Sequence, residues 1–356
     1  MRGIRLIVLV LLCLPLLPQD VTDPTTRIGV TVTEIVAPVT VHDRDGNIVN
    51  GLQPNQFRLF DNDKEQDIRV DVTYQPISLV IAIQANASMD AVLPQIKKIG
   101  TMLESFVVGD QGEAAVMAFD HRFRIFQEFT SDTAKIAEAM KKITPGSSSS
   151  RMIDAVDESI RMLRRRPSNR RRVLLLISET RDIASEGKLR TAVIDAQLSN
   201  VSVYTVNVSR VITTLTGRQQ PPRPDPLPPA MRSMPSNVPA TPNSVMQKSG
   251  SQGSSGDVIP LLLELYRDVK AIFRDNPAEA LTKATGGAEF SFLKQRGLEE
   301  AVAKIGSELH SQYLISYNPS NKDEGGFHEI KVQLNGPGAR DLKVRTRPGY
   351  WLATVK

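Results

Sequence analysis

Strand-like and helix-like segments alternate through residues 79–208, and this alternation limits the possible folds more than any other feature of the sequence. Apolar runs of strand length occupy residues 79–83, 173–177 and 201–208, and each lies next to a segment with the apolar spacing of an amphipathic helix. Strands that alternate with helices in this way form a parallel sheet with helices on both faces. The sequence therefore predicts a doubly wound α/β domain.

Short alternating runs on both sides of this domain predict a separate β-rich part. In residues 26–75 they are divided by turn-rich pieces such as DRDGN and DNDKEQ, and in residues 313–356 they include QYLISYNP, HEIKVQL and LKVRTRP. We expect these N- and C-terminal segments to form a small β-sandwich-like unit beside an α/β domain that spans residues 76–312.

A stretch rich in proline, serine and glycine interrupts the α/β domain at residues 213–257. It holds too few large apolar residues to offset the entropy lost on ordering, so we expect a disordered insertion. Its PPRPDPLPP portion also has the composition of a polyproline II ligand, and this role stays open. Helical spacing resumes at residues 258–273, 278–284 and 298–309.

Residues 1–22 have the layout of an export signal. Arg2 and Arg5 precede an apolar run at residues 6–17, which is too short to span a bilayer comfortably. A cleaved signal peptide and an uncleaved N-terminal anchor both stay open, and either predicts a secreted or periplasmic protein. Cys13, the only cysteine, lies in this segment, so a mature chain would have no disulfide, cysteine nucleophile or thiolate metal site.

Several longer motifs carry a resemblance to a known family. They are VTVHDRDGNIVNGLQPNQFRLFDNDKEQDI near the start of the chain, and ATGGAEF, ELHSQYLISYNPSNKDEGGFHEIKVQL and VRTRPGYW towards its end. In their order the chain resembles von Willebrand factor A-related proteins of the type abundant in acidobacteria. The resemblance implies a von Willebrand factor A-like α/β domain between β-rich N- and C-terminal segments.

The resemblance also implies a candidate binding site at the carboxyl edge of the sheet, where the family holds a divalent cation. Its pattern is Asp-x-Ser-x-Ser after the first strand, a threonine from a second loop and an aspartate from a third. In this chain the matching positions hold Gln84, Asn86, Ser88, Ser150 and Glu179, with Asp182 nearby.

The cation itself is not expected, because an amide at position 84 removes one of the carboxylates that offset the cost of dehydrating it. Magnesium held by Ser88, Ser150 and Glu179 stays open as an alternative. We therefore expect a degenerate metal-ion-dependent adhesion site without a cofactor.

Other chemical signals have structural explanations. The arginine-rich run at residues 161–172 lacks interleaved aromatic residues, so we expect a solvated loop and no nucleic-acid partner. Asp43, Asp45 and Asn47 have the spacing that opens a calcium loop, but its twelfth position is Pro54, so a tight β-turn is expected. The four histidines form no metal motif, and the sequence has no nucleophile elbow, phosphate loop or dinucleotide motif.

These features predict an exported, non-enzymatic module that binds an unknown protein or surface ligand through the three loops. A membrane contact is expected only through an uncleaved N-terminal segment. Three alternatives stay open: cation-dependent adhesion through the same loops, an extracytoplasmic hydrolase with an unrecognised site, and a spacer in an envelope assembly.

Overall fold

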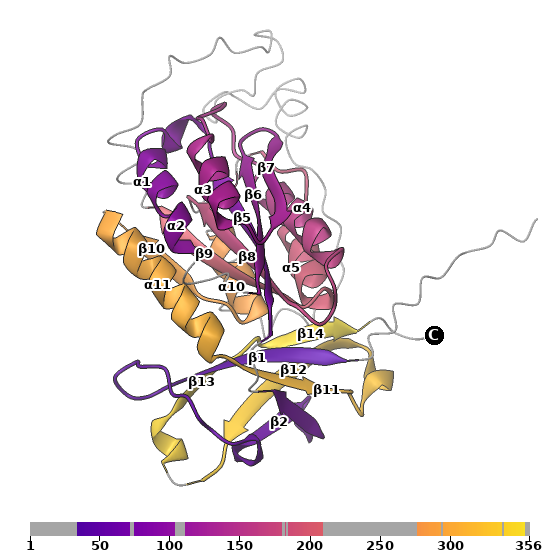
Figure 1. Cartoon of the computed structure of the whole chain (residues 1–356). Coiled ribbons are helices and arrows are strands. Elements are labelled where there is room, and N and C mark those ends of the chain that lie inside the picture. Colours follow the sequence, from indigo (N-terminus) through magenta and orange to yellow (C-terminus); the bar gives the residue numbers. More distant parts are fainter. Residues whose placement is uncertain are drawn as a thin grey trace, which may run out of the picture. The chain divides into compact units, whose positions relative to one another are not determined.

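Six strands form the central sheet of the α/β part, in the order β10-β9-β8-β5-β6-β7 (Figure 1). Their bounds are β5 Ile77–Gln84, β6 Glu113–Phe119, β7 Phe123–Thr130, β8 Arg171–Ser178, β9 Val201–Val208 and β10 Glu289–Phe292. Neighbouring strands run parallel except β6 and β7, which are antiparallel. The sheet is mixed, which corrects the expectation of a parallel sheet.

The edge strand β7 has no counterpart among the predicted strands, because its sequence, FRIFQEFT, follows no clear period. It pairs with one neighbour and is only partly buried, with Ile125 44% exposed. Two register shifts against β6 also break the alternation of its side chains. Such a strand has neither the continuous apolar run of a buried strand nor the strict alternation of a half-buried one.

The computed structural model describes residues 34–71, 75–103, 111–179, 182, 184–208, 276–292, 295–336 and 338–352, all of which belong to one unit, Thr33–Lys356. The predicted export signal at residues 1–22, the insertion at residues 213–257 and the helix at residues 258–273 lie outside the described residues.

Helices cover both faces of the central sheet and divide its core into two apolar clusters. One face carries α1 Leu93–Lys98, α2 Gly100–Leu103, α3 Thr133–Lys141 and α11 Gln295–Ser311, and the other carries α4 Met152–Arg164, α5 Leu189–Leu198 and α10 Pro277–Thr285. With helices on both sides, all eight residues of β5 are buried, which explains its continuous apolar sequence. Gly286 ends α10 in the left-handed conformation, with a φ of 77°.

Two four-stranded antiparallel sheets form the β-sandwich, and each contains strands from both ends of the chain. Their orders are β13-β1-β11-β4 and β14-β12-β2-β3. The N-terminal strands are β1 Ile35–His42, β2 Phe57–Asp61, β3 Lys64–Glu65 and β4 Ile68–Asp71, and the C-terminal strands are β11 Tyr313–Tyr317, β12 Gly326–Leu334, β13 Lys343–Arg345 and β14 Gly349–Leu352. Residues 47–51, NIVNG, lie among the short alternating runs of the N-terminal segment but contribute only an isolated bridge between Ile48 and His42.

A buried polar network joins the two sheets at Asp61, the last residue of β2. This fully buried carboxylate accepts hydrogen bonds of 2.7–3.1 Å from four side chains of the C-terminal part: Tyr317, Asn321, His328 and Tyr350. Burial, with the nearby Asp61, raises the pKa of both tyrosines, so they remain neutral donors. The network ties the N-terminal segment to the C-terminal one.

No helix among the described residues has the length and apolar character needed to cross a membrane.

Candidate functional site

The predicted first and third loops leave the central sheet at neighbouring strands. The chain passes from β5 to β6 on one side, while β8 continues to β9 on the other, so the strand order reverses between β5 and β8. Ligands of open α/β sheets bind at such a reversal, beyond the carboxyl ends of the strands. Gln84 is the last residue of β5 and Glu179 directly follows β8, which places both at this point.

A chain of amide hydrogen bonds joins the loops there. The Glu179 N–H donates to Gln84 Oε1 at 3.0 Å, and Gln84 Nε2 donates to Asn86 Oδ1 at 3.0 Å. Asn86 Nδ2 then donates to the carbonyl of Ser148 in the second loop, at 3.5 Å. Because a backbone N–H begins the chain and a backbone carbonyl ends it, the orientation of both side-chain amides follows from the network.

The remaining contacts of this group come from a hydroxyl and a carboxylate. Ser88 Oγ donates to Asn86 Oδ1 at 2.9 Å, and Gln84 Nε2 also lies 3.4 Å from Glu179 Oε2. Gln84 and Asn86 are buried, whereas Ser88 and Glu179 are half-buried. The structure therefore brings four of the six predicted site residues together and leaves two of them accessible.

Backbone bonds hold the second loop against the first. The Gly146 N–H donates to Ala85 O at 2.6 Å, and the Ala87 N–H donates to Ser147 O at 2.8 Å. A Cβ on Gly146 would lie 1.7 Å from Asp120 Oδ2, so this close approach requires glycine.

Asp120, which the sequence analysis missed, organises this loop. Its carboxylate accepts the backbone N–H groups of Ser147 and Arg122, each at 3.0 Å. Burial acts to raise the pKa of Asp120, but these two bonds, with the electrostatic effects of His121 and Arg124, hold it below its ordinary value. Asp120 directly follows β6, the parallel neighbour of β5, so the rule that places sites at strand ends could have found it.

The other two predicted site residues, Ser150 and Asp182, lie near the N-terminus of α4. Asp182 Oδ1 accepts the N–H of Met152, the first residue of α4, at 3.0 Å and the hydroxyl of Ser185 at 2.7 Å. Asp182 thus caps the helix. The Ser150 carbonyl accepts the Ala184 N–H, and the buried Ser150 Oγ has no hydrogen-bond partner among the described residues.

The groups at the sheet edge do not fit a divalent cation. At the position where the family supplies a carboxylate, Gln84 presents an NH₂ group that points towards Glu179. Asn86 Oδ1 already accepts two hydrogen bonds. In the described part of the chain, no group of three or more His, Cys, Asp or Glu residues could hold a metal. Ser88, Ser150 and Glu179 together supply one negative charge, and a single water would satisfy the Ser150 hydroxyl.

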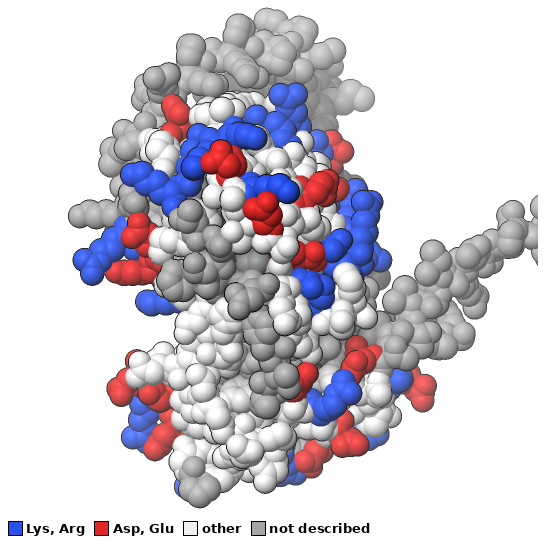
Figure 2. Space-filling view, viewed as in Figure 1, with Lys and Arg blue, Asp and Glu red and all other residues white. Residues whose placement is uncertain are grey.

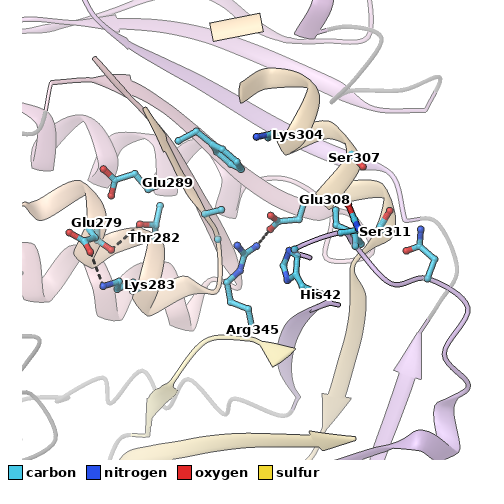
Figure 3. A pocket seen from close by; sticks show the side chains of 17 residues that line it. His42, Glu279, Thr282, Lys283, Glu289, Lys304, Ser307, Glu308, Ser311 and Arg345 are labelled. Carbon is cyan, nitrogen blue, oxygen red and sulfur yellow. Dashed lines mark hydrogen bonds and ion pairs between the residues drawn. The ribbon is translucent and has the colours of Figure 1, made fainter. Parts of the chain in front are cut away.

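A cleft of about 730 Å³ lies elsewhere, lined by α10, α11, β10, β13 and the loop after β1 (Figure 3). Its acidic groups are engaged: Glu308 accepts from Tyr204 at 2.8 Å and pairs with Arg345, and Glu279 pairs with Lys283. No hydrogen bond joins His42 to a hydroxyl among the described lining residues.

The arginine-rich run is largely engaged within the fold. Arg166 makes two hydrogen bonds to Glu113, at 2.6 and 2.7 Å, and Arg170 donates to Ser78 and to the Ile77 carbonyl. On the face shown in Figure 2, basic and acidic side chains are intermixed. The guanidinium groups of Arg166 and Arg170 thus anchor the start of β8.

Comparisons with known proteins gave a family match and a set of similar solved structures. Residues 79–181 match the family model of the von Willebrand factor type A domain. Among solved structures, BatB from Bacteroides thetaiotaomicron is 13% identical, with a TM-score of 0.39 over 65% of this chain and 99% of that chain. A von Willebrand factor type A structure from Catenulispora acidiphila is 10% identical, with a TM-score of 0.43 over 91% and 75%. Proximal thread matrix protein 1 from mussel byssus is 11% identical, with a TM-score of 0.44 over 71% and 51%.

A comparison with proteins of curated function gave no match. The matched segment begins in β5 and ends just beyond β8, so it contains the first two loops and Glu179. The mixed sheet, its helices on both faces and the family match lead to one assignment. The chain contains a von Willebrand factor type A domain, of which residues 79–181 are the matched part.

Proposed function

We propose that this chain is an exported, non-catalytic binding protein that captures a protein or surface ligand without a divalent cation. The contact surface is the loop face, which we define as Asn86, Ser88, Ser147, Ser148 and Glu179. Domains of this family are generally non-catalytic interaction modules.

The amide chain from the Glu179 N–H through Gln84 and Asn86 to the Ser148 carbonyl is the observation that carries the proposal. In a cation-dependent site the metal holds the loops together and leaves a position open for the partner. Here neutral hydrogen bonds link the same three loops, so the loop face is ordered before a partner binds. A preformed surface loses less entropy on binding than a mobile one.

The accessible groups of the loop face define the chemistry of its partner. The Ser148 side chain is exposed, Ser88 and Ser147 are half-buried, and Glu179 supplies a carboxylate beside them. Hydroxyls both donate and accept, and the carboxylate accepts only. We expect the partner to present hydrogen-bond donors, with a Lys or Arg opposite Glu179.

Export is the second part of the proposal, and the order of residues in the first 22 positions supports it: basic residues, an apolar run, and then polar residues. The rest of the sequence has no cysteine, which suits an oxidising compartment.

The test uses the immobilised full chain and the envelope and culture-fluid proteins of its source organism. Captured proteins are identified by mass spectrometry for wild type, Ser88→Ala and Glu179→Ala, each with and without a chelator. Asp63→Asn is the matched control, because Asp63 is an exposed acid on the β-sandwich.

We expect wild type and Asp63→Asn to capture the same partner in equal amounts, with or without chelator. Ser88→Ala and Glu179→Ala should each capture at least tenfold less of it. Loss of capture in chelator would instead support cation-dependent adhesion. Equal capture by wild type and both loop variants would show that the loop face is not the binding surface.

A further inference from the structure

A second cleft, of about 120 Å³, lies between strands β1 and β11 of the β-sandwich, the starts of β8 and β9, and the end of α10. Its described lining includes four arginines, Arg170, Arg171, Arg172 and Arg347, and no Asp or Glu. The rest of the lining is part polar, with Gln75, Ser168, Asn200, Ser202 and Thr285, and part apolar, with Val36, Pro38, Val201 and Leu314.

Arg347, which lines this cleft, is a buried arginine whose guanidinium is only partly hydrogen-bonded. The residue is 2% exposed, and its Nε and Nη2 atoms are buried without a hydrogen-bond partner among the described residues. Nη1 donates to the Gln197 carbonyl at 3.3 Å, and the guanidinium lies over the Tyr350 ring, 5.7 Å from its centroid. A buried guanidinium with unsatisfied N–H groups is costly, so a group that accepts those hydrogen bonds would stabilise it.

Arg172, in the same cleft, also has a buried nitrogen atom without a hydrogen-bond partner among the described residues. It donates to the carbonyls of Ser199 and Arg166 at 3.0 and 2.8 Å, while its buried Nε has no partner. These bonds, and that of Arg347 to Gln197, satisfy carbonyls near the C-terminus of α5 and in the loop before β8. Capping carbonyls therefore accounts for some of the guanidinium N–H groups and leaves three nitrogen atoms, Arg347 Nε, Arg347 Nη2 and Arg172 Nε, without a partner among the described residues.

The charges around the two arginines leave a positive excess. The carboxylate that acts on Arg347 is Asp61, which already accepts four hydrogen bonds and forms no ion pair with it in the described structure. Burial lowers the pKa of Arg347 to about 10. Burial and then the positive charge of Arg164 also lower the pKa of Arg172. An anion in the cleft would oppose both effects.

From this geometry we infer that the cleft binds a small oxyanion of the phosphate or sulfate class. The Nε and Nη2 groups of Arg347 lie on one edge of its guanidinium, the edge that binds two oxygens of such an ion at once. Arg172 Nε supplies a third donor. The cleft holds roughly four waters at about 30 Å³ each, so it admits the anion but not a nucleotide or a sugar. Exposed Ser168 and Asn200 stand at its rim.

The test measures binding of inorganic phosphate and of sulfate to the full chain by calorimetry and thermal unfolding, at constant ionic strength set with chloride. Arg347→Met and Arg172→Met remove the proposed donors. Arg296→Met is the matched control, because Arg296 is an exposed arginine on α11, paired with Glu300. Should Arg347→Met fail to fold, Arg172→Met still tests the site.

We expect saturable binding that raises the melting temperature of wild type and Arg296→Met and weakens at least tenfold in Arg172→Met. A phosphoserine peptide is tested in parallel. Tighter binding of the peptide than of phosphate would assign the site to a phosphoryl group on a larger molecule, and equal or weaker binding would assign it to the free ion. Absence of saturable binding by all three probes, or equal binding in Arg172→Met, would overturn the inference.

Discussion

Two polar networks in this protein hold separate segments of the chain together, one by a buried carboxylate and the other by neutral amides. In the β-sandwich, the buried Asp61 carboxylate receives four hydrogen bonds from the C-terminal part, all from within the fold. At the edge of the central sheet, the Gln84 amide links the loops by neutral bonds, and Ser88 and Glu179 remain half-buried. The first network is closed to solvent, whereas the second ends in groups that a partner can reach.

The difference separates a structural role from a binding role. A buried charge is tolerated when donors surround it, and it then fixes which segments pack together. A neutral amide chain costs less to bury, so it can order a surface without closing it. We expect changes in the Asp61 network to affect folding and changes on the loop face to affect capture.

Asp61→Asn should have the largest effect on stability. The new NH₂ group would face hydroxyl and N–H donors, so we expect the free energy of unfolding to fall by about 3–5 kcal/mol. Denaturant unfolding measures it, with Asp63→Asn changing stability by less than about 1 kcal/mol as the control. If Asp61→Asn lowered the free energy of unfolding by less than about 1 kcal/mol, the Asp61 network would not have the structural role that distinguishes it from the loop network.

Gln84→Glu should have the next largest effect. It keeps the shape of the side chain but places an oxygen against Asn86 Oδ1 and a second carboxylate beside Glu179. We expect a loss of about 1–3 kcal/mol at neutral pH. The loss should shrink as the pH falls, because protonation of one carboxyl of the pair relieves the repulsion. Urea unfolding at pH 5 and 7.5 checks this. A Gln84→Glu protein as stable as wild type at pH 7.5 would show that the amide hydrogen bonds do not stabilise the loops.

A half-buried carboxylate, Asp157 on α4, differs from Asp61 because its buried Oδ1 lacks any donor among the described residues. Burial, followed by the charges of Asp195 and Asp154, raises its pKa from 3.8 to about 6. The folded state therefore keeps a proton that the unfolded state releases, and stability falls as pH rises from about 4 through 6.

Asp157→Asn should consequently raise the melting temperature at pH 7.5, by a few degrees at most, and leave it unchanged at pH 4. Thermal unfolding at the two pH values measures this. Glu158→Gln, the neighbour on α4, is the control and should show no such gain. A gain of equal size at both pH values would trace the effect to something other than the Asp157 charge.

The sequence was informative where a pattern repeats along the chain. Continuous apolar runs such as residues 79–83 and 173–177 predicted the buried strands, and the family pattern located Gln84 and Glu179, which the structure joins. Asp182 was predicted as a nearby site residue of the same loop as Glu179, yet its carboxylate caps α4. A loop match fixes the position of a residue in the chain but not the direction in which its side chain points.

The features that sequence analysis missed depend on long-range packing. The tyrosine and histidine partners of Asp61 lie 256, 267 and 289 residues away along the chain, and no periodic signal links such positions. The unsatisfied N–H groups of Arg347 exist only because two sheets and α5 enclose that side chain. β7 escaped prediction because an edge strand with two register shifts has no clean period.

The smallest expected effect gives the most direct test of the central claim, that the loops are held by hydrogen bonds and not by a cation. The melting temperature of the full chain is measured in millimolar Mg²⁺, Mn²⁺ or Ca²⁺ and in chelator, for wild type and Glu179→Gln. We predict that no cation shifts the melting temperature of wild type. A ligand at a hundred times its Kd would add about 2.7 kcal/mol. A rise of several degrees that disappears in Glu179→Gln would show that a cation site has survived and would contradict the account.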